Sequence, residues 1–187
     1  MTSLMSLALA TGATAATPRP LPLTARVLRP GDFPSFTPET PLSFKTPKAY
    51  VAVGSGMTAR ERKTWASRLT REGFKRDLTE FLEGPEGPRT GLSGVMQLGS
   101  AASARAELGA ELLASGAQTT FRVKRIPGAV GFGFASPHGG ENILFTDGPF
   151  LYVLGYAWQG RVQNPTRSSL VDAATRLYKR VRGHPAR

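Results

Sequence analysis

The sequence contains no cysteine and only two histidines among its 187 residues. Without cysteine the chain has no disulfide, no thiolate metal ligand, no cysteine nucleophile and no lipid-modified cysteine. Two histidines are too few for a histidine-rich metal centre, and neither a metal nor a cofactor is expected. No segment reaches the roughly 20 consecutive apolar residues that a membrane-spanning helix requires. The fold must therefore rest on core packing, and 40% hydrophobic residues are enough for one core.

Acidic residues are also scarce, since 13 Asp and Glu stand against 24 Lys and Arg and the formal net charge is +11. The excess is concentrated in two segments. Residues 58–77 hold seven basic and three acidic side chains, and residues 161–187 hold seven and one. Such patches attract polyanions and make binding dependent on salt. An Arg-rich, Ala/Gly/Pro-rich composition also arises in GC-rich genomes without any ligand, so both interpretations stay open.

The first residues have part of the pattern of an export signal. Residues 4–16 form a short apolar run that ends in small residues, with Ala13 and Ala15 at the −3 and −1 positions of a cleavage site. No Lys or Arg precedes this run, so the usual basic opening segment is missing. We predict a signal peptide over residues 1–15 and a secreted protein. The alternative is an Ala/Thr-rich tail on a cytosolic protein.

The rest of the chain divides into three parts by composition. Residues 16–57 are rich in proline and are expected to form an arm on the domain surface, with one or two short strands such as Leu42–Phe44. Residues 58–183 are expected to form a single α+β domain, and residues 184–187 a basic tail.

Local signals define the elements of this domain. Thr58 and Glu61 have the spacing of a capping box, in which each side chain accepts a hydrogen bond from a free amide of the first helical turn. Asp147-Gly148 between two apolar runs predicts a hairpin, and Asn164-Pro165 predicts a helix start. We predict helices over residues 58–73, 101–115 and 164–182, and strands over 74–82, 92–98, 119–126, 129–135, 142–146 and 150–157. Because short turns join the strands, this order favours a mostly antiparallel sheet of about six strands flanked by three helices.

Catalytic motifs are missing from the sequence. His138 is the one histidine inside the domain, and Glu141 or Asp147 would serve as its orienting carboxylate in a small hydrolase. Its Pro-His-Gly-Gly context is equally typical of an exposed turn. Glu107 and Glu111 are spaced i, i+4 on the second helix and are expected on a solvated face.

Binding candidates come from the basic helices and from one aromatic strand. On the strand, Tyr152 and Tyr156 share a face that either packs into the core or lines a pocket. The candidate binding residues are Arg60, Lys63, Arg71, Arg176, Lys179, Arg180, Tyr152 and Tyr156.

Several sequence stretches resemble a known group of proteins. The leader with Ala-Thr-Ala, the stretch Arg29-Pro-Gly-Asp-Phe33-Pro, residues 95–102 and residues 142–148 are similar to uncharacterised secreted proteins of high-GC Gram-positive bacteria. The order of elements is similar to Mog1/PsbP-like domains of cell-envelope lipoproteins, which implies an antiparallel sheet flanked by helices. The resemblance carries no catalytic motif, and the absent lipid-attachment cysteine departs from the lipoprotein pattern.

Three functions are consistent with the sequence. The first is a secreted, non-enzymatic binding or accessory module whose basic helices contact an anionic cell-wall polymer, a lipid surface or an acidic protein. The second is an extracytoplasmic hydrolase that uses His138. The third is a basic nucleic-acid-binding protein, which is less favoured because no basic strand with interleaved aromatics of the RNA-recognition type is present.

Overall fold

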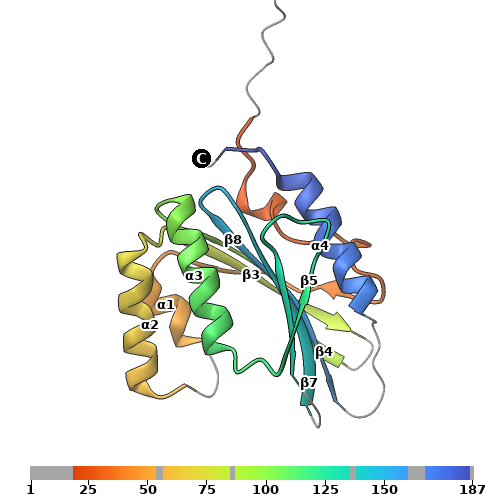
Figure 1. The fold of residues 1–187 in the computed structure, drawn as a ribbon, viewed down its shortest axis with the longest axis horizontal. Helices are drawn as coiled ribbons and strands as arrows, with labels where there is room; N and C mark the ends of the chain where they lie inside the picture. The colour runs from red at the N-terminus through yellow and green to blue at the C-terminus, as the bar shows by residue number, and fades with distance from the viewer. Residues whose placement is uncertain (1–18, 54–56, 85–86, 135–137, 160–166, 186–187) are drawn as a thin grey trace, which may run out of the picture.

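The computed structural model describes residues 19–53, 57–84, 87–134, 138–159 and 167–185. These residues form an α+β fold with one eight-stranded sheet and four α-helices (Figure 1). The strands are β1 (Thr37–Pro38), β2 (Leu42–Phe44), β3 (Arg76–Gly84), β4 (Gly87–Gln97), β5 (Thr119–Arg122), β6 (Val130–Phe134), β7 (His138–Asp147) and β8 (Phe150–Gln159). The helices are α1 (Pro47–Ala52), α2 (Ala59–Arg71), α3 (Ala101–Ala114) and α4 (Arg167–Val181), and a 3-10 turn, η1, covers Leu23–Ala25. No helix in the described ranges is long and apolar enough to cross a membrane.

The sheet has the order β1-β3-β4-β8-β7-β6-β5, with β2 also pairing with β3, and its strand pairs are antiparallel. The predicted fold class and strand arrangement are therefore confirmed, and so is the short strand Leu42–Phe44. The expected numbers of about six strands and three helices are wrong. The difference lies in the arm, which supplies β1, β2 and α1. Helix α1 begins because Thr46 caps it and Pro47 occupies its first turn.

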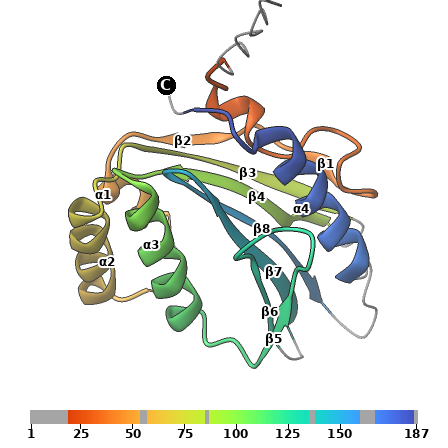
Figure 2. The ribbon, with the colours of Figure 1, turned by 45° about the horizontal axis from the view of Figure 1, so that its top comes forward.

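Helices pack on both faces of the sheet (Figure 2). Helix α4 covers one face over the main core, which includes Ile143, Phe145 and Tyr152 from the central strands. Helices α1, α2 and α3 cover part of the other face over a second core. Side chains alternate along β8, so Tyr152 belongs to the main core and Leu151 to the second.

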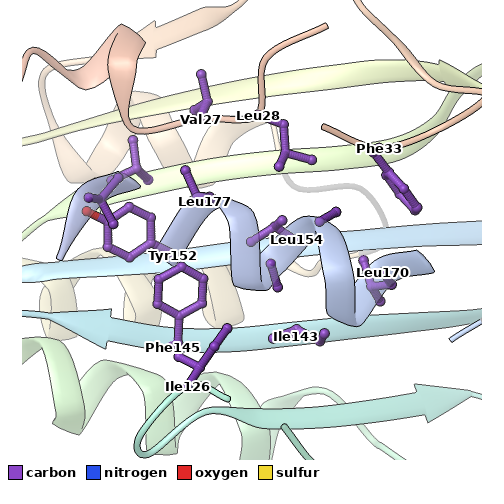
Figure 3. Packing of buried hydrophobic residues seen from close by; sticks show 14 of the residues in the cluster. Val27, Leu28, Phe33, Ile126, Ile143, Phe145, Tyr152, Leu154, Leu170 and Leu177 are labelled. Atoms are coloured by element: carbon purple, nitrogen blue, oxygen red, sulfur yellow. The ribbon is translucent and has the colours of Figure 1, made fainter. Parts of the chain in front are cut away.

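The proline-rich arm is part of the main core. Val27, Leu28 and Phe33 are each at most 4% exposed and lie beside Leu177 of α4 and Leu154 of β8 (Figure 3). The expectation that the arm lies on the domain surface is therefore wrong. Proline spacing identified an irregular segment, whereas the apolar residues between the prolines determine that it is buried.

Two sequence predictions fall outside the described residues. The signal peptide expected over residues 1–15 is one, and the Asn164-Pro165 helix start is the other. Helix α4 is described from Arg167. The capping box of α2 is confirmed, because the Thr58 hydroxyl accepts a hydrogen bond from the Glu61 amide and the Glu61 carboxylate accepts one from the Thr58 amide.

Candidate functional site

The two basic helices lie on opposite faces of the sheet. Helix α4 packs on the main core, and α2 packs on the second core. Their basic side chains therefore form separate surfaces, and one partner would meet both only by wrapping around the domain. The charge of each helix has to be considered by itself.

Helix α4 uses two of its basic side chains to hold the N-terminal arm. Arg180 donates hydrogen bonds to the Asp32 carboxylate at 2.8 Å and to the Val27 carbonyl at 2.7 Å. Arg176 is exposed and donates from Nε to the Asp32 carbonyl at 3.1 Å. Lys179 is exposed. Much of the basic character of α4 therefore has an intramolecular role that the sequence did not reveal.

The two tyrosines of β8 are buried in the main core. Tyr152 is fully buried, and its hydroxyl accepts a hydrogen bond from Arg26 at 2.7 Å. Tyr156 is 4% exposed and donates to the Glu141 carboxylate at 3.1 Å. Burial raises the pKa of both hydroxyl groups. Their shared face packs into the main core, and Tyr156 also lines a hollow of about 290 Å³ beside Phe134 and Asn142.

Glu141 and Asp147, the carboxylates proposed to orient His138, do not form a pair with it: Glu141 is bonded to other side chains, and Asp147 lies at the far end of β7. The Glu141 carboxylate accepts hydrogen bonds from Tyr156 and from Arg167, whose guanidinium also stacks on a neighbouring phenylalanine ring. His138 and Asp147 occupy the two ends of the ten-residue strand β7, which are about 30 Å apart at 3.3 Å per residue. The side chain of His138 lies outside what the structure describes. Asp147 is therefore not brought to His138, and Glu141 has a structural role in the core.

The α2 candidates are spread over different sides of the helix. Lys63 lines a groove between α1 and α2. Arg60 lines a separate hollow between α2 and α3. Arg71 is exposed in the last turn of α2 and lines neither. Of the candidate binding residues, Lys63 is the one that the structure places in this groove.

The groove between α1 and α2 has a volume of about 560 Å³, within the range of about 300–1,000 Å³ that is usual for small-ligand sites. Helical spacing creates the α2 wall, because residues 59, 63, 66 and 70 recur at intervals of four and three and share one side of the helix. The apolar walls consist of Pro47, Val51, Ala52, Ala59 and Ala66. Alanine is short, so the two helices leave a hollow where larger side chains would meet.

The rim of the groove carries three basic residues, Lys48, Arg62 and Lys63, and none of the lining residues is acidic. Arg62 donates from Nη2 to the Met57 carbonyl at 2.8 Å. Its buried Nε has no hydrogen-bond partner within the described part of the chain. Three cations with no acidic residue among the lining residues favour an anion at this rim.

Sequence reasoning missed Lys48 and Arg62. Lys48 lies in the segment predicted to be an extended arm, although Thr46-Pro47 has the cap and first-turn proline that indicate the start of α1. Arg62 belongs to the basic excess of residues 58–77, but nothing in its sequence position distinguishes it from the other basic residues there. Its importance depends on the position of α1, which the sequence did not show.

The other side of α2 contacts α3 through a buried carboxylate. Glu107 is fully buried and accepts hydrogen bonds from Trp65 Nε1 at 2.9 Å and from Arg68 Nε at 2.8 Å. The expectation that Glu107 lies on a solvated face is therefore wrong. Burial, together with the neighbouring Glu107 carboxylate, raises the pKa of Glu111 to about 8. This cluster holds α2 against α3 and thereby fixes the α2 wall of the groove.

Metal binding has no candidate site among the described residues, where no group of three or more His, Cys, Asp or Glu side chains is arranged to hold an ion.

Comparison with family models and with curated proteins finds no match. No family is assigned. Among solved structures, the extracellular domain of PknH from Mycobacterium tuberculosis matches with a TM-score of 0.46 and 10% identity, covering 78% of this chain and 86% of that one. The comparisons give no support to the Mog1/PsbP resemblance. Function must therefore be inferred from the residues of this chain.

Proposed function

We propose that this chain is a secreted, non-enzymatic binding module for an anionic partner, and that the groove between α1 and α2 makes the contact. The observation that carries this proposal is a set of three basic side chains around a groove with no acidic residue among its described lining residues. The positive charge of these three side chains favours an anion.

The arrangement of the other basic residues supports this choice of site. Arg176 and Arg180 of α4 bond to the arm. Lys48 and Lys63 are exposed and take part in no described salt bridge. An exposed cation without an internal partner can meet a ligand without losing an existing bond, so the groove is the better candidate.

Binding assays with two anionic probes test the proposal. The full chain is titrated with phosphatidylglycerol vesicles and with polyglycerol phosphate, and phosphatidylcholine vesicles serve as the uncharged reference. We expect at least one anionic probe to bind, and its affinity to fall at least about tenfold between 0.1 M and 1 M salt, because the screening length falls from about 10 Å to about 3 Å.

Charge reversal locates the contact. The double variant Lys48→Glu/Lys63→Glu should lose at least about tenfold in affinity, which corresponds to about 1.4 kcal/mol. The matched control is Arg122→Glu/Lys124→Glu, which makes the same change in charge at exposed residues away from the groove that take part in no described salt bridge. Equal losses in both variants would show that the contact is not at the groove. Absence of binding to both anionic probes at 0.1 M salt would overturn the anionic-partner proposal.

Export is a separate part of the proposal and rests on the pattern of residues 4–16. The mass of the native protein tests it, because cleavage after Ala15 predicts a chain that begins at Ala16. A mature protein that begins at Met1 or Thr2 would show that the segment is not a signal peptide.

A further inference from the structure

From the walls of the same groove we infer the chemical class of the ligand: an anionic amphiphile, with an aliphatic chain against the groove walls and a phosphate or carboxylate head at the basic rim. This inference rests on the proposed function, because it assumes that the groove binds an anion. It adds that the anion carries a hydrocarbon tail.

The apolar walls of the groove favour a ligand with a hydrocarbon tail. Val51 is 3% exposed and belongs to the second core, so the floor of the groove is continuous with buried apolar packing. Ala52 and Ala59 are exposed on the two helices that border the groove. A tail-free anion would leave this apolar surface in contact with water. A hydrocarbon chain would cover this surface and would itself be removed from water, which is favourable.

The basic rim of the groove favours a ligand with an anionic head group. Lys48 extends from α1, and Arg62 and Lys63 extend from α2, so the cations border the apolar walls from both helices. The Arg62 Nε is the one buried polar atom of the groove lining without a hydrogen-bond partner in the described structure. A negatively charged head group at this rim would be attracted by the three cations while its tail stays on the alanine walls.

The same geometry argues against a polyanion as the preferred ligand. Repeated charged groups require cations along a polar track. Here the cations border a mainly apolar hollow, and Arg60 and Arg71 are outside it. An amphiphile matches both surfaces, whereas a polymer would match the rim alone.

Three soluble probes separate the parts of this inference. The full chain is titrated with dodecyl phosphate, which has both tail and anion, with glycerol phosphate, which has the anion alone, and with dodecyl maltoside, which has the tail alone. All detergent concentrations stay below micelle formation. We expect dodecyl phosphate to bind at least about tenfold more tightly than either of the others, or about 1.4 kcal/mol.

Two variants connect the binding to the groove. Arg62→Gln should weaken dodecyl phosphate at least about tenfold and leave dodecyl maltoside unchanged, because it removes the charge and not the wall. Ala52→Phe should weaken both detergents by filling the hollow. Ala106→Phe is the matched control, since Ala106 is also an exposed helical alanine but belongs to α3 and does not line the groove. Thermal unfolding confirms that each variant is folded.

The outcomes separate the two proposals. If glycerol phosphate binds as tightly as dodecyl phosphate, the anion site stands and the amphiphile inference is wrong. The inference is also wrong if dodecyl phosphate fails to bind while polyglycerol phosphate binds in a manner sensitive to Lys48→Glu/Lys63→Glu. Equal binding of dodecyl phosphate and dodecyl maltoside would also show that the inference is wrong, because the anionic head would then contribute nothing to binding. If no anionic probe binds, both proposals fall.

Discussion

The guanidinium of Arg26 donates a hydrogen bond to the hydroxyl of Tyr152 at 2.7 Å, although 126 residues separate the two. The same guanidinium lies 3.8 Å from the centre of the Phe150 ring and donates to the carbonyls of His184 and Pro185 at 3.0 Å. Arg26 is fully buried. One side chain therefore joins the arm, the central strand β8 and the C-terminal segment.

Tyr152→Phe should destabilise the protein by about 1–3 kcal/mol, because it removes the acceptor of a buried charged donor without changing the shape of the core. The measurement is urea unfolding. Tyr178→Phe is the control, since Tyr178 packs edge-on against Phe145 and its hydroxyl has no hydrogen bond within the described structure. It should stay within about 0.5 kcal/mol. Equal losses in the two variants would show that the Arg26 contact contributes little.

Glu107→Gln should destabilise the protein by about 2–3 kcal/mol. The change weakens charged hydrogen bonds from Arg68, and the Glu107 side chain is fully buried. Asp172→Asn is the matched control, because Asp172 pairs with Arg125 at 3.3 Å while both side chains are more than half exposed. An exposed pair contributes about 0–1 kcal/mol. Urea unfolding at neutral pH gives the unfolding free energies of both variants. A smaller loss of stability for Glu107→Gln than for Asp172→Asn would show that the Glu107–Arg68 contact does not hold α2 against α3.

Glu111→Gln should flatten the dependence of stability on pH between about pH 5 and pH 8. The folded-state pKa of Glu111 is about 8, above its ordinary value of 4.5. In this window the unfolded chain releases the proton and the folded chain retains it, so stability falls as the pH rises. Glutamine does not release a proton in this range, so the variant lacks this contribution to the pH dependence. Unfolding free energies measured at intervals across the window check this, and a slope identical to that of the parent protein would contradict it.

Glu61→Gln is the control for this pH experiment. Hydrogen bonds from the Thr58 amide and hydroxyl lower the pKa of Glu61. Its contribution is therefore present above its ordinary pKa of 4.5 and is lost as the pH falls through the lower folded value. Between pH 5 and pH 8 the slope of this variant should match that of the parent protein.

Two Gly→Ala substitutions should have opposite effects. A Cβ at Gly131 would lie 2.1 Å from the Phe121 ring, and Gly131→Ala should cost about 1–3 kcal/mol because that ring must move. A Cβ at Gly109 in α3 would meet nothing within 4 Å. Gly109→Ala should add about 0.5–1 kcal/mol through helix propensity. Thermal unfolding measures both, and a loss of stability in Gly109→Ala would contradict the open position assigned to it.

Local sequence signals determined most of the secondary structure. The Thr58–Glu61 capping box started α2, and Asp147-Gly148 joined β7 to β8, as their spacing predicted. Such signals work because a cap or a tight turn is satisfied by residues within a few positions. The absence of cysteine was equally decisive, because a chain without thiols forms neither a disulfide nor a thiolate site in any fold.

Only the tertiary structure decided which charges are available to a partner. The sequence shows two basic helices of similar charge, yet Arg180 pairs with Asp32 across 148 residues, while Lys48 and Lys63 flank an open groove. The tertiary structure likewise buries Tyr152 against Arg26 and Glu107 against Arg68. A side chain's partner depends on which distant segments pack together, and periodicity within a helix or strand contains no information about that packing.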